Sequence, residues 1–239
     1  MDIRFDFSSR VALVVGGSKG IGQKVCVDLL NAKAEVFYLS RNGNQELDDL
    51  GAKHLKCDLR NEDNIKSCFS QLASLDFLIN CAAINHCKKV EDISSQEWDD
   101  VLTVNLRSYF LTCKEAIKKM KRSNFGRIVN VSSIAGRHRS IVSGTHYVAS
   151  KSAIIGLTRQ LSYECAKDNI TVNVVCPSQT MTPMLEESMT SQQIEDLCTT
   201  IPIRRIATTE DQSLPILFLC SSGGNYITGA AIDVNGGQY

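Results

Sequence analysis

A buried-strand pattern that runs directly into a glycine-rich turn and then into a helix constrains this chain more than any other feature. Val11–Val15 is an uninterrupted apolar and largely β-branched run, which is typical of a strand buried on both faces of a sheet. Gly16–Gly22 follows with the spacing Gly-x-x-x-Gly-x-Gly, and a helical pattern with Val25 and Leu29 on one side comes next. Such a unit belongs to folds in which parallel strands alternate with helices.

The same turn is suited to hold a pyrophosphate. Glycines let the backbone approach phosphate oxygens, and the free N–H groups and positive dipole at the start of the next helix favour an anion. An ordinary glycine turn is the alternative, but the flanking strand and helix favour a dinucleotide site. The turn residues that we expect to contact a dinucleotide are Gly16, Ser18, Lys19, Gly20, Ile21 and Gly22.

Strand and helix patterns alternate along the rest of the chain. We expect strands near 11–15, 35–39, 53–57, 76–80, 126–132, 170–176 and 231–234, and helices near 20–32, 61–73, 96–122, 146–167, 184–198 and 209–220. This alternation predicts a seven-stranded parallel sheet with helices on both faces and ligands at the carboxyl ends of the strands. No repeat, low-complexity tract or linker marks a boundary, so a single domain over residues 1–239 is expected.

Composition narrows the class of protein. Lys plus Arg and Asp plus Glu number 26 each, so no strong attraction to nucleic acid or a membrane surface is expected. No apolar stretch approaches the ~20 residues that span a bilayer, and the N-terminus lacks a signal-peptide pattern. The ten cysteines are scattered without Cys-x-x-Cys. We therefore expect free thiols in a reducing cytoplasm, and no metal site from the cysteines or the four histidines.

Tyr147 and Lys151 are four residues apart, which places both on one face of a helix. A cation beside a phenol favours phenolate and lowers the pKa of the Tyr side chain from its ordinary value near ~10. A Tyr tuned in this way can be the general acid or base of an alcohol/ketone interconversion. Taken alone, the spacing also fits an ordinary pair on a helix surface, so its context decides.

Further motifs follow the glycine turn in a fixed order. They are Cys57-Asp58-Leu59, Asn80-Cys81-Ala82-Ala83, Asn105, Asn130-Val131-Ser132-Ser133, the Tyr147/Lys151 pair, and the segment from Pro177 to Met184. With the glycine turn, these motifs resemble those of the short-chain dehydrogenase/reductase family over nearly the whole chain. The resemblance implies a Rossmann-type doubly wound fold and an oxidoreductase that interconverts a ketone and a secondary alcohol with a nicotinamide dinucleotide.

The resemblance also implies a catalytic set made of Asn105, Ser133, Tyr147 and Lys151. Ser133 and Tyr147 would bond to the carbonyl oxygen of the substrate, and Tyr147 would give up its proton. Lys151 would lower the pKa of Tyr147 and hold the nicotinamide ribose. Asn105 would anchor a water that relays protons, although a polar break in a core helix explains it equally well. Ser133 is preferred to Ser132 because it lies one step beyond the strand.

Further cofactor contacts are expected at the strand ends. They are Ser40, Arg41, Asp58, Leu59, Asn80, Pro177, Thr180 and Thr182, with Tyr147 and Lys151. The chain departs from the family pattern at four small residues, which bear on fine geometry and leave the proton-transfer residues intact. They are Val15 in place of Thr, Cys81 and Ala83 in place of Asn and Gly, and Ser178 in place of Gly.

The end of the second expected strand indicates which dinucleotide is used. NAD enzymes usually place a carboxylate there to bind the ribose hydroxyls, whereas this strand ends in Ser40 and Arg41. Together with Lys19, these residues suit a 2′-phosphate, which prefers charge-assisted hydrogen bonds. Solvated surface charges are the alternative. We predict that NADP(H) is preferred to NAD(H).

The substrate is the least determined part of the prediction. Segments 83–92, 134–146 and 178–205 are expected to rim the pocket, and their polar and basic residues fit a sugar, polyol, sugar derivative or acyl thioester better than a steroid. L-Xylulose reductases and 3-oxoacyl-carrier reductases are resembled equally. The family pairs the helices expected at 96–122 and 146–167, which implies a homodimer or homotetramer. A silent NADP(H)-binding sensor or a family epimerase remains an alternative.

Overall fold

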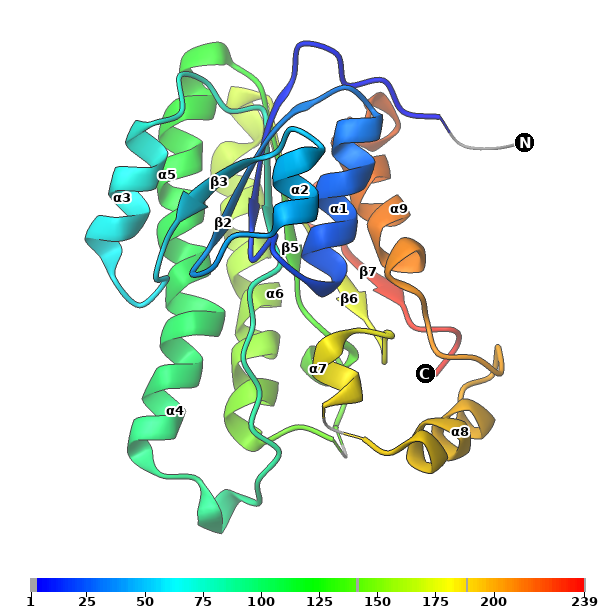
Figure 1. Cartoon of the computed structure of the whole chain (residues 1–239). Coiled ribbons are helices and arrows are strands. Elements are labelled where there is room, and N and C mark those ends of the chain that lie inside the picture. The colour runs from blue at the N-terminus through cyan, green and yellow to red at the C-terminus, as the bar shows by residue number, and fades with distance from the viewer. Residues whose placement is uncertain (1–3, 141, 188, 239) are drawn as a thin grey trace.

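The computed structural model describes residues 4–140, 142–187 and 189–238. These residues form a seven-stranded, all-parallel sheet in the order β3-β2-β1-β4-β5-β6-β7 (Figure 1). The strands are β1 (Val11–Val15), β2 (Glu35–Ser40), β3 (Lys53–Lys56), β4 (Phe77–Asn80), β5 (Gly126–Val131), β6 (Ile170–Pro177) and β7 (Ala231–Val234). The predicted parallel sheet is confirmed, and each strand lies within one or two residues of its expected position.

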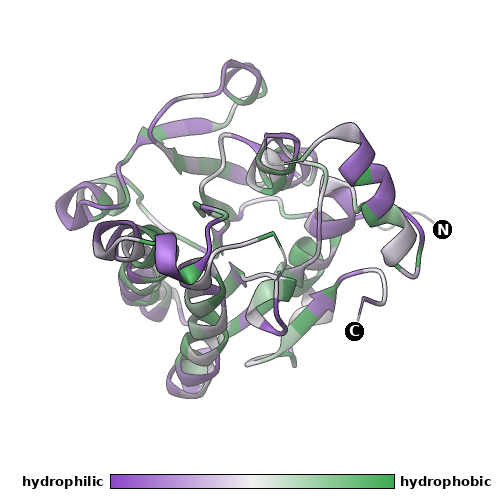
Figure 2. Cartoon of the chain, turned by 90° about the horizontal axis from the view of Figure 1, so that it is seen from below, coloured by the Kyte–Doolittle hydropathy of each residue, from purple (hydrophilic) through white to green (hydrophobic). Residues whose placement is uncertain are grey.

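Helices cover both faces of this sheet. They are α1 (Gly20–Asn31), α2 (Gln45–Asp49), α3 (Glu62–Ser70), α4 (Ser95–Leu102), α5 (Ser108–Ser123), α6 (Thr145–Cys165), α7 (Pro183–Glu186), α8 (Ser191–Thr200) and α9 (Thr209–Cys220). Helices α1 and α9 share one apolar core with the sheet, and α3, α5 and α6 share the core on the other face (Figure 1). Seen from below, the outer helices carry both hydrophilic and hydrophobic stretches (Figure 2).

Two of the expected helices are divided. The helix expected at 96–122 consists of α4, a π-helical turn at Thr103–Arg107 and α5. The helix expected at 184–198 is interrupted between α7 and α8. Thr190 is the N-cap of α8 and forms two reciprocal hydrogen bonds with Gln193. Residue 188 of that expected helix lies outside the described residues. Helix α2 was not expected. The Asn44 side chain caps its N-terminus, and its Leu47 side chain is buried in the core.

The strand order reverses between β1 and β4, since the chain proceeds outward from β1 to β3 and then returns to the other side of β1. In open parallel sheets this reversal opens a crevice at the carboxyl ends of the strands, where ligands bind. The chain thereby brings the end of β1, the end of β4 and the end of β5 to one edge of the sheet. Among the residues described, no helix combines the length and apolar character needed to cross a membrane.

A buried polar network ties the two central strands to the helices behind them. Asn80 Nδ2 donates to Asn130 Oδ1 at 2.9 Å, and Asn130 Nδ2 donates to the Thr158 hydroxyl of α6 at 3.0 Å. The Thr112 hydroxyl of α5 lies 2.9 Å from Asn80 Oδ1. All four side chains are fully buried, so each depends on the others for hydrogen bonds that water cannot supply. The network therefore fixes how α5 and α6 sit on the sheet.

Removing the centre of this network should destabilise the fold. We expect Asn130→Ala to lower the free energy of unfolding by about 3 kcal/mol, because it removes the oxygen that accepts from the buried Asn80 amide and the N–H that donates to the buried Thr158 hydroxyl. Urea unfolding measured by circular dichroism gives this quantity. Asn42→Ala, at an exposed position, is the control and should change it by less than about 0.5 kcal/mol. Equal losses in the two variants would contradict a structural role for the network.

Candidate active site

A pocket of about 320 Å³ opens at the carboxyl edge of the sheet, a size within the range of small-molecule sites. It is lined by the glycine turn, by the residues that follow β2, β3, β4 and β5, by the start of α6 and by the segment after β6. Of the residues predicted to form the site, Asn80 and Asn105 do not line it. The residues that do are Gly16, Ser18, Lys19, Gly20, Ile21, Gly22, Ser40, Arg41, Asp58, Leu59, Ser133, Tyr147, Lys151, Pro177, Thr180 and Thr182.

The glycine turn is packed closely against the chain that leaves β4. Gly16 has a φ of +80°, and a Cβ at this position would lie 2.7 Å from the backbone nitrogen of Ala82. A Cβ at Gly22 would lie 2.2 Å from the Gly16 carbonyl oxygen, so both positions require glycine. Lys19 stands at the N-cap of α1 without a side-chain cap bond, which leaves N–H groups of the first turn available to an anion.

Lys151 is held inside the protein at the end of β5. It is 1% exposed, and its Nζ donates to the Val131 carbonyl oxygen at 2.8 Å. The ammonium also lies 5.5 Å from the ring centroid of Tyr109 and 5.6 Å from that of Tyr147, within the range of cation–π attraction. Burial, which disfavours the charged form, lowers the pKa of Lys151 to about 8.

The phenol of Tyr147 faces the pocket beside Ser133. Burial raises the pKa of Tyr147, and a hydrogen bond with the Ser133 hydroxyl opposes part of that rise. The expectation that Lys151 makes this phenol more acidic is therefore wrong in direction. Burial removes water from the phenol, and this loss of hydration is the largest cause of the rise. The phenol is protonated at neutral pH.

The two neighbouring serines after β5 have different hydrogen-bond partners. The hydroxyl of Ser132 is buried and donates to the Lys151 carbonyl oxygen at 2.7 Å, which fastens α6 to the strand. The hydroxyl of Ser133 accepts from the Ala135 N–H at 3.1 Å and lies beside Tyr147 at the pocket. Of the two, Ser133 is the one whose hydroxyl lies beside the phenol.

Asn105 and Asn80 are enclosed by protein rather than directed into the pocket. Asn105 lies in the π-helical turn, where its amide accepts from Ile84 N at 2.8 Å and donates to Ile84 O at 2.9 Å. It also donates to Ser150 Oγ of α6 at 3.2 Å. The Asn80 amide belongs to the buried network behind β4, and a contact of this residue with a cofactor stays a prediction. Both residues hold the walls of the pocket in place.

Two exposed basic residues of the pocket are Lys19 in the glycine turn and Arg41 directly after β2. Lys19 and Arg41 line the pocket with exposed side chains, and neither forms an ion pair within the part of the chain that the structure describes. The Ser40 hydroxyl donates to the Asn42 carbonyl oxygen at 2.6 Å and lies 3.0 Å from His54 Nε2. Sequence reasoning missed His54, which stacks on Tyr38 and supports this strand end.

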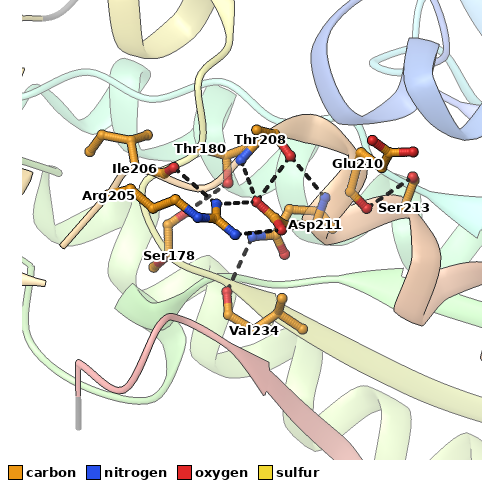
Figure 3. Close-up of polar contacts among 10 residues, drawn as sticks. Ser178, Thr180, Arg205, Ile206, Thr208, Glu210, Asp211, Ser213 and Val234 are labelled. Carbon is orange, nitrogen blue, oxygen red and sulfur yellow. Dashed lines mark hydrogen bonds and ion pairs between the residues drawn. The ribbon is translucent and has the colours of Figure 1, made fainter. Parts of the chain in front are cut away.

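The segment after β6 is anchored by backbone hydrogen bonds to Ala207. Met181 N donates to Ala207 O at 2.8 Å, and Ala207 N donates to Gln179 O at 3.1 Å. Next to this bridge, Arg205 pairs with Asp211 at 2.9 Å, and Asp211 is part of the cap of α9 (Figure 3). Sequence reasoning missed this anchor, although the capping spacing of Thr208 and Asp211 marks the start of α9.

A parallel sheet with a glycine turn at its reversal point, and a Ser–Tyr–Lys group in the same pocket, define a dinucleotide-dependent oxidoreductase. A family model described as enoyl-(acyl carrier protein) reductase matches residues 15–238. The chain belongs to the short-chain dehydrogenase/reductase family, whose members bind a nicotinamide cofactor and act on alcohol or carbonyl groups.

Similar proteins cover nearly the whole chain. The 3-oxoacyl-acyl-carrier-protein reductase FabG of Rickettsia prowazekii is 33% identical over 98% of this chain and 98% of its own. The acetoacetyl-CoA reductase of an Acinetobacter strain is 32% identical over 96% and 98%. A solved 3-oxoacyl-acyl-carrier-protein reductase with bound NAD, from Brucella melitensis, superposes with a TM-score of 0.91, at 29% identity over 99% of this chain and 93% of that one.

The close packing of the glycine turn gives a direct test of the site. We expect Gly16→Ala to weaken dinucleotide binding at least tenfold, because the new Cβ would meet the Ala82 backbone and strain a positive φ. Quenching of protein fluorescence by added NADPH measures the affinity. Gly156→Ala is the control, since a Cβ there meets nothing within 4 Å. Wild-type affinity in Gly16→Ala would contradict this location for the dinucleotide.

Proposed function

We propose that this protein is an NADP(H)-dependent oxidoreductase that interconverts a ketone and a secondary alcohol on a polar small molecule. The observation that supports it is the meeting of Ser133, Tyr147 and Lys151 in the pocket that also contains the glycine turn. Among the polar substrates, an acyl thioester is favoured, because similar proteins are named as 3-oxoacyl-acyl-carrier-protein and acetoacetyl-CoA reductases. Sugars, polyols and sugar derivatives are the other candidates.

The residues present fit a nicotinamide dinucleotide. The required glycines and the uncapped start of α1 suit the pyrophosphate, while Asp58 and Leu59 line the part of the pocket beyond β3 that suits the adenine. Lys151, Pro177, Thr180 and Thr182 would hold the nicotinamide end, with the anchored segment after β6 keeping the last three in place. The bound cofactor supplies a hydride to the carbonyl carbon.

Proton transfer is the part of the reaction that this chain performs itself. The hydroxyls of Ser133 and Tyr147 would bond to the carbonyl oxygen, and each donor aimed at developing negative charge contributes about 3 kcal/mol. Tyr147 holds its proton at neutral pH, so it is ready to donate it as the alcohol forms. The nearby ammonium of Lys151 would then stabilise the phenolate left behind. Asn105 would contribute indirectly, by holding Ile84 and Ser150 beside the pocket.

The preference for NADP(H) is supported by charge at the end of β2. Lys19 and Arg41 line the pocket, and the strand end offers no carboxylate that would repel a 2′-phosphate. The Ser40 hydroxyl would become the third donor of this proposed phosphate site by turning away from the Asn42 carbonyl oxygen, to which it otherwise donates. A silent NADP(H)-binding sensor of the same fold is the second candidate, which the measurements below separate by turnover.

We also propose that the protein is a cytoplasmic homodimer or homotetramer. All ten cysteines are free thiols, which suits a reducing compartment. The faces of α4, α5 and α6 expose Trp98, Phe110 and Tyr163, and large exposed aromatic residues are common at contacts between subunits. Leu106, Leu157 and Leu161, by contrast, pack against the cores. The aromatic residues are therefore the better candidates for the interface.

Turnover by Tyr147 variants tests the proposed reaction. We expect Tyr147→Phe to lower kcat at least a thousandfold with acetoacetyl-CoA and NADPH, because the proton donor is lost, while the Kd for NADPH stays within about twofold. Ser133→Ala should lower kcat about a hundredfold. Ser132→Ala is the matched comparison and should act on stability instead. NADPH absorbance records turnover against ketones, ketoses, diketones and acyl thioesters; dinucleotide binding without turnover on any of them would favour the sensor.

The cofactor preference has its own test. We expect Arg41→Ala to reduce the ratio of kcat/KM with NADPH to kcat/KM with NADH at least tenfold, because a charge-assisted bond to the 2′-phosphate is lost. Arg159→Ala, exposed on α6 and away from the pocket, is the control and should leave the ratio unchanged. An unchanged ratio in Arg41→Ala would refute the proposed phosphate site.

A further inference from the structure

The helix that carries Tyr147 begins without an ordinary cap. The N-cap residue of α6 is Gly144, which has no side chain to accept the free N–H groups of the first turn. In its place, Nδ1 of His146 accepts from the N–H of Tyr147 at 2.9 Å. The ring of the residue that precedes Tyr147 therefore serves as the acceptor that a Ser, Thr or Asp side chain at the N-cap usually provides.

The packing around this ring excludes the usual solution. A Cβ at position 144 would lie 2.4 Å from Cε1 of His146 and 2.4 Å from the carbonyl oxygen of His86. A capping side chain at Gly144 would thus collide with both. His146 is 0% exposed, so no water can replace its nitrogen as the acceptor. The Tyr147 N–H depends on this one ring.

The hydrogen bond also fixes the protonation state of the ring. A backbone N–H can only donate, so Nδ1 must carry the lone pair and the neutral ring must carry its proton on Nε2. Nε2 is buried, and no described residue offers it a hydrogen-bond partner. A second proton, on Nδ1, would point the ring N–H at the Tyr147 N–H, and the hydrogen bond between them would be lost.

The charged groups around His146 come from two elements. The ring of His86 lies 6.1 Å from it, centroid to centroid, and Lys88 of the same loop pairs with Glu97 of α4 at 2.5 Å. Burial has the largest effect and lowers the pKa of His146. A hydrogen bond with the Gly144 backbone and the charge of Glu97 raise this pKa, while His86 and Lys88 lower it. The ring is thus neutral at pH 7, in agreement with the hydrogen bond it accepts.

We propose that neutral His146 is a positioning residue, which caps α6 at the backbone of Tyr147 and lowers turnover when it becomes protonated. The effect on turnover rests on the proposed function, whereas the cap does not. The folded protein favours the neutral ring, so the pKa of His146 is lower in the folded than in the unfolded chain. The stabilisation of the fold by this cap is therefore complete above the ordinary histidine pKa near ~6.5. It is lost as the pH falls through the lowered pKa of the folded protein.

Two substitutions separate the hydrogen bond from the titration. His146→Asn keeps an acceptor near the position of Nδ1 but cannot titrate, and His146→Leu removes the acceptor. Hydrogen exchange at the Tyr147 amide, measured by mass spectrometry at pH 8, should be about fivefold faster in the Leu variant and close to wild type in the Asn variant. In wild type, protection corrected for the intrinsic exchange rate should decrease as the pH falls below the ordinary histidine value near ~6.5, and in the Asn variant it should not.

Kinetics complete the test. With acetoacetyl-CoA and NADPH, the Leu variant should lose about tenfold in kcat at every pH, with the Kd for NADPH unchanged. The Asn variant should keep most of the neutral-pH activity and lose the fall of kcat on the acid side. His86→Asn, which removes the neighbouring titrating ring, is the control and should keep that fall.

The outcomes are distinct. Wild-type exchange in the Leu variant would overturn the cap, whatever the activity. Faster exchange in the Leu variant combined with identical pH profiles of kcat in wild type and the Asn variant would overturn the link to turnover. If wild type reduces no carbonyl substrate, the proposed function fails, and the exchange comparison still decides whether His146 holds the turn.

Discussion

The ammonium of Lys151, buried at the end of β5, fixes the geometry on which the site depends. Its Nζ bonds to the Val131 carbonyl, and its own carbonyl accepts from Ser132, so two bonds set the position of α6 along the strand. That position brings Tyr147 beside Ser133. No carboxylate among the described residues pairs with this charge, and a carbonyl and two aromatic faces offset its lost hydration. The lowered pKa of Lys151, about 8, is the consequence.

The polar side chains of the site fall into two groups: those that bond inside the protein and those that face the pocket. Asn80, Asn105 and Ser132 use their hydrogen bonds inside the protein, and they hold β4, the segment after it and α6 in register. Ser133 and Tyr147 instead present their hydroxyls to the pocket. Ser132 and Ser133, which both follow the end of β5, thus differ in purpose because one hydroxyl bonds to the Lys151 carbonyl oxygen and the other lies at the pocket. The side chains that bond inside the protein thus hold in place the two hydroxyls that can contact a ligand.

The sequence predicted the sheet, the glycine turn and the Tyr147/Lys151 pair well, because apolar runs, glycine spacing and helical periodicity are local signals. It did not predict the π-helical turn at Thr103–Arg107 or the bond of Asn105 in that turn to Ile84, because contacts between residues distant in sequence leave no local signal. The direction of the pKa shift of Tyr147 was wrong for a related reason: four-residue spacing brings a cation near the phenol but says nothing of how completely the phenol is buried.

The titration of Lys151 tests this account most directly. Nitrogen NMR of protein labelled on its lysine side chains, with the Lys151 signal assigned through Lys151→Met, would follow the ammonium as the pH rises. The account predicts a midpoint at about 8, because burial without a carboxylate disfavours the charge. A midpoint at the ordinary lysine value near ~10.4 would show that the ammonium is hydrated or paired, and would contradict the geometry from which the site is built.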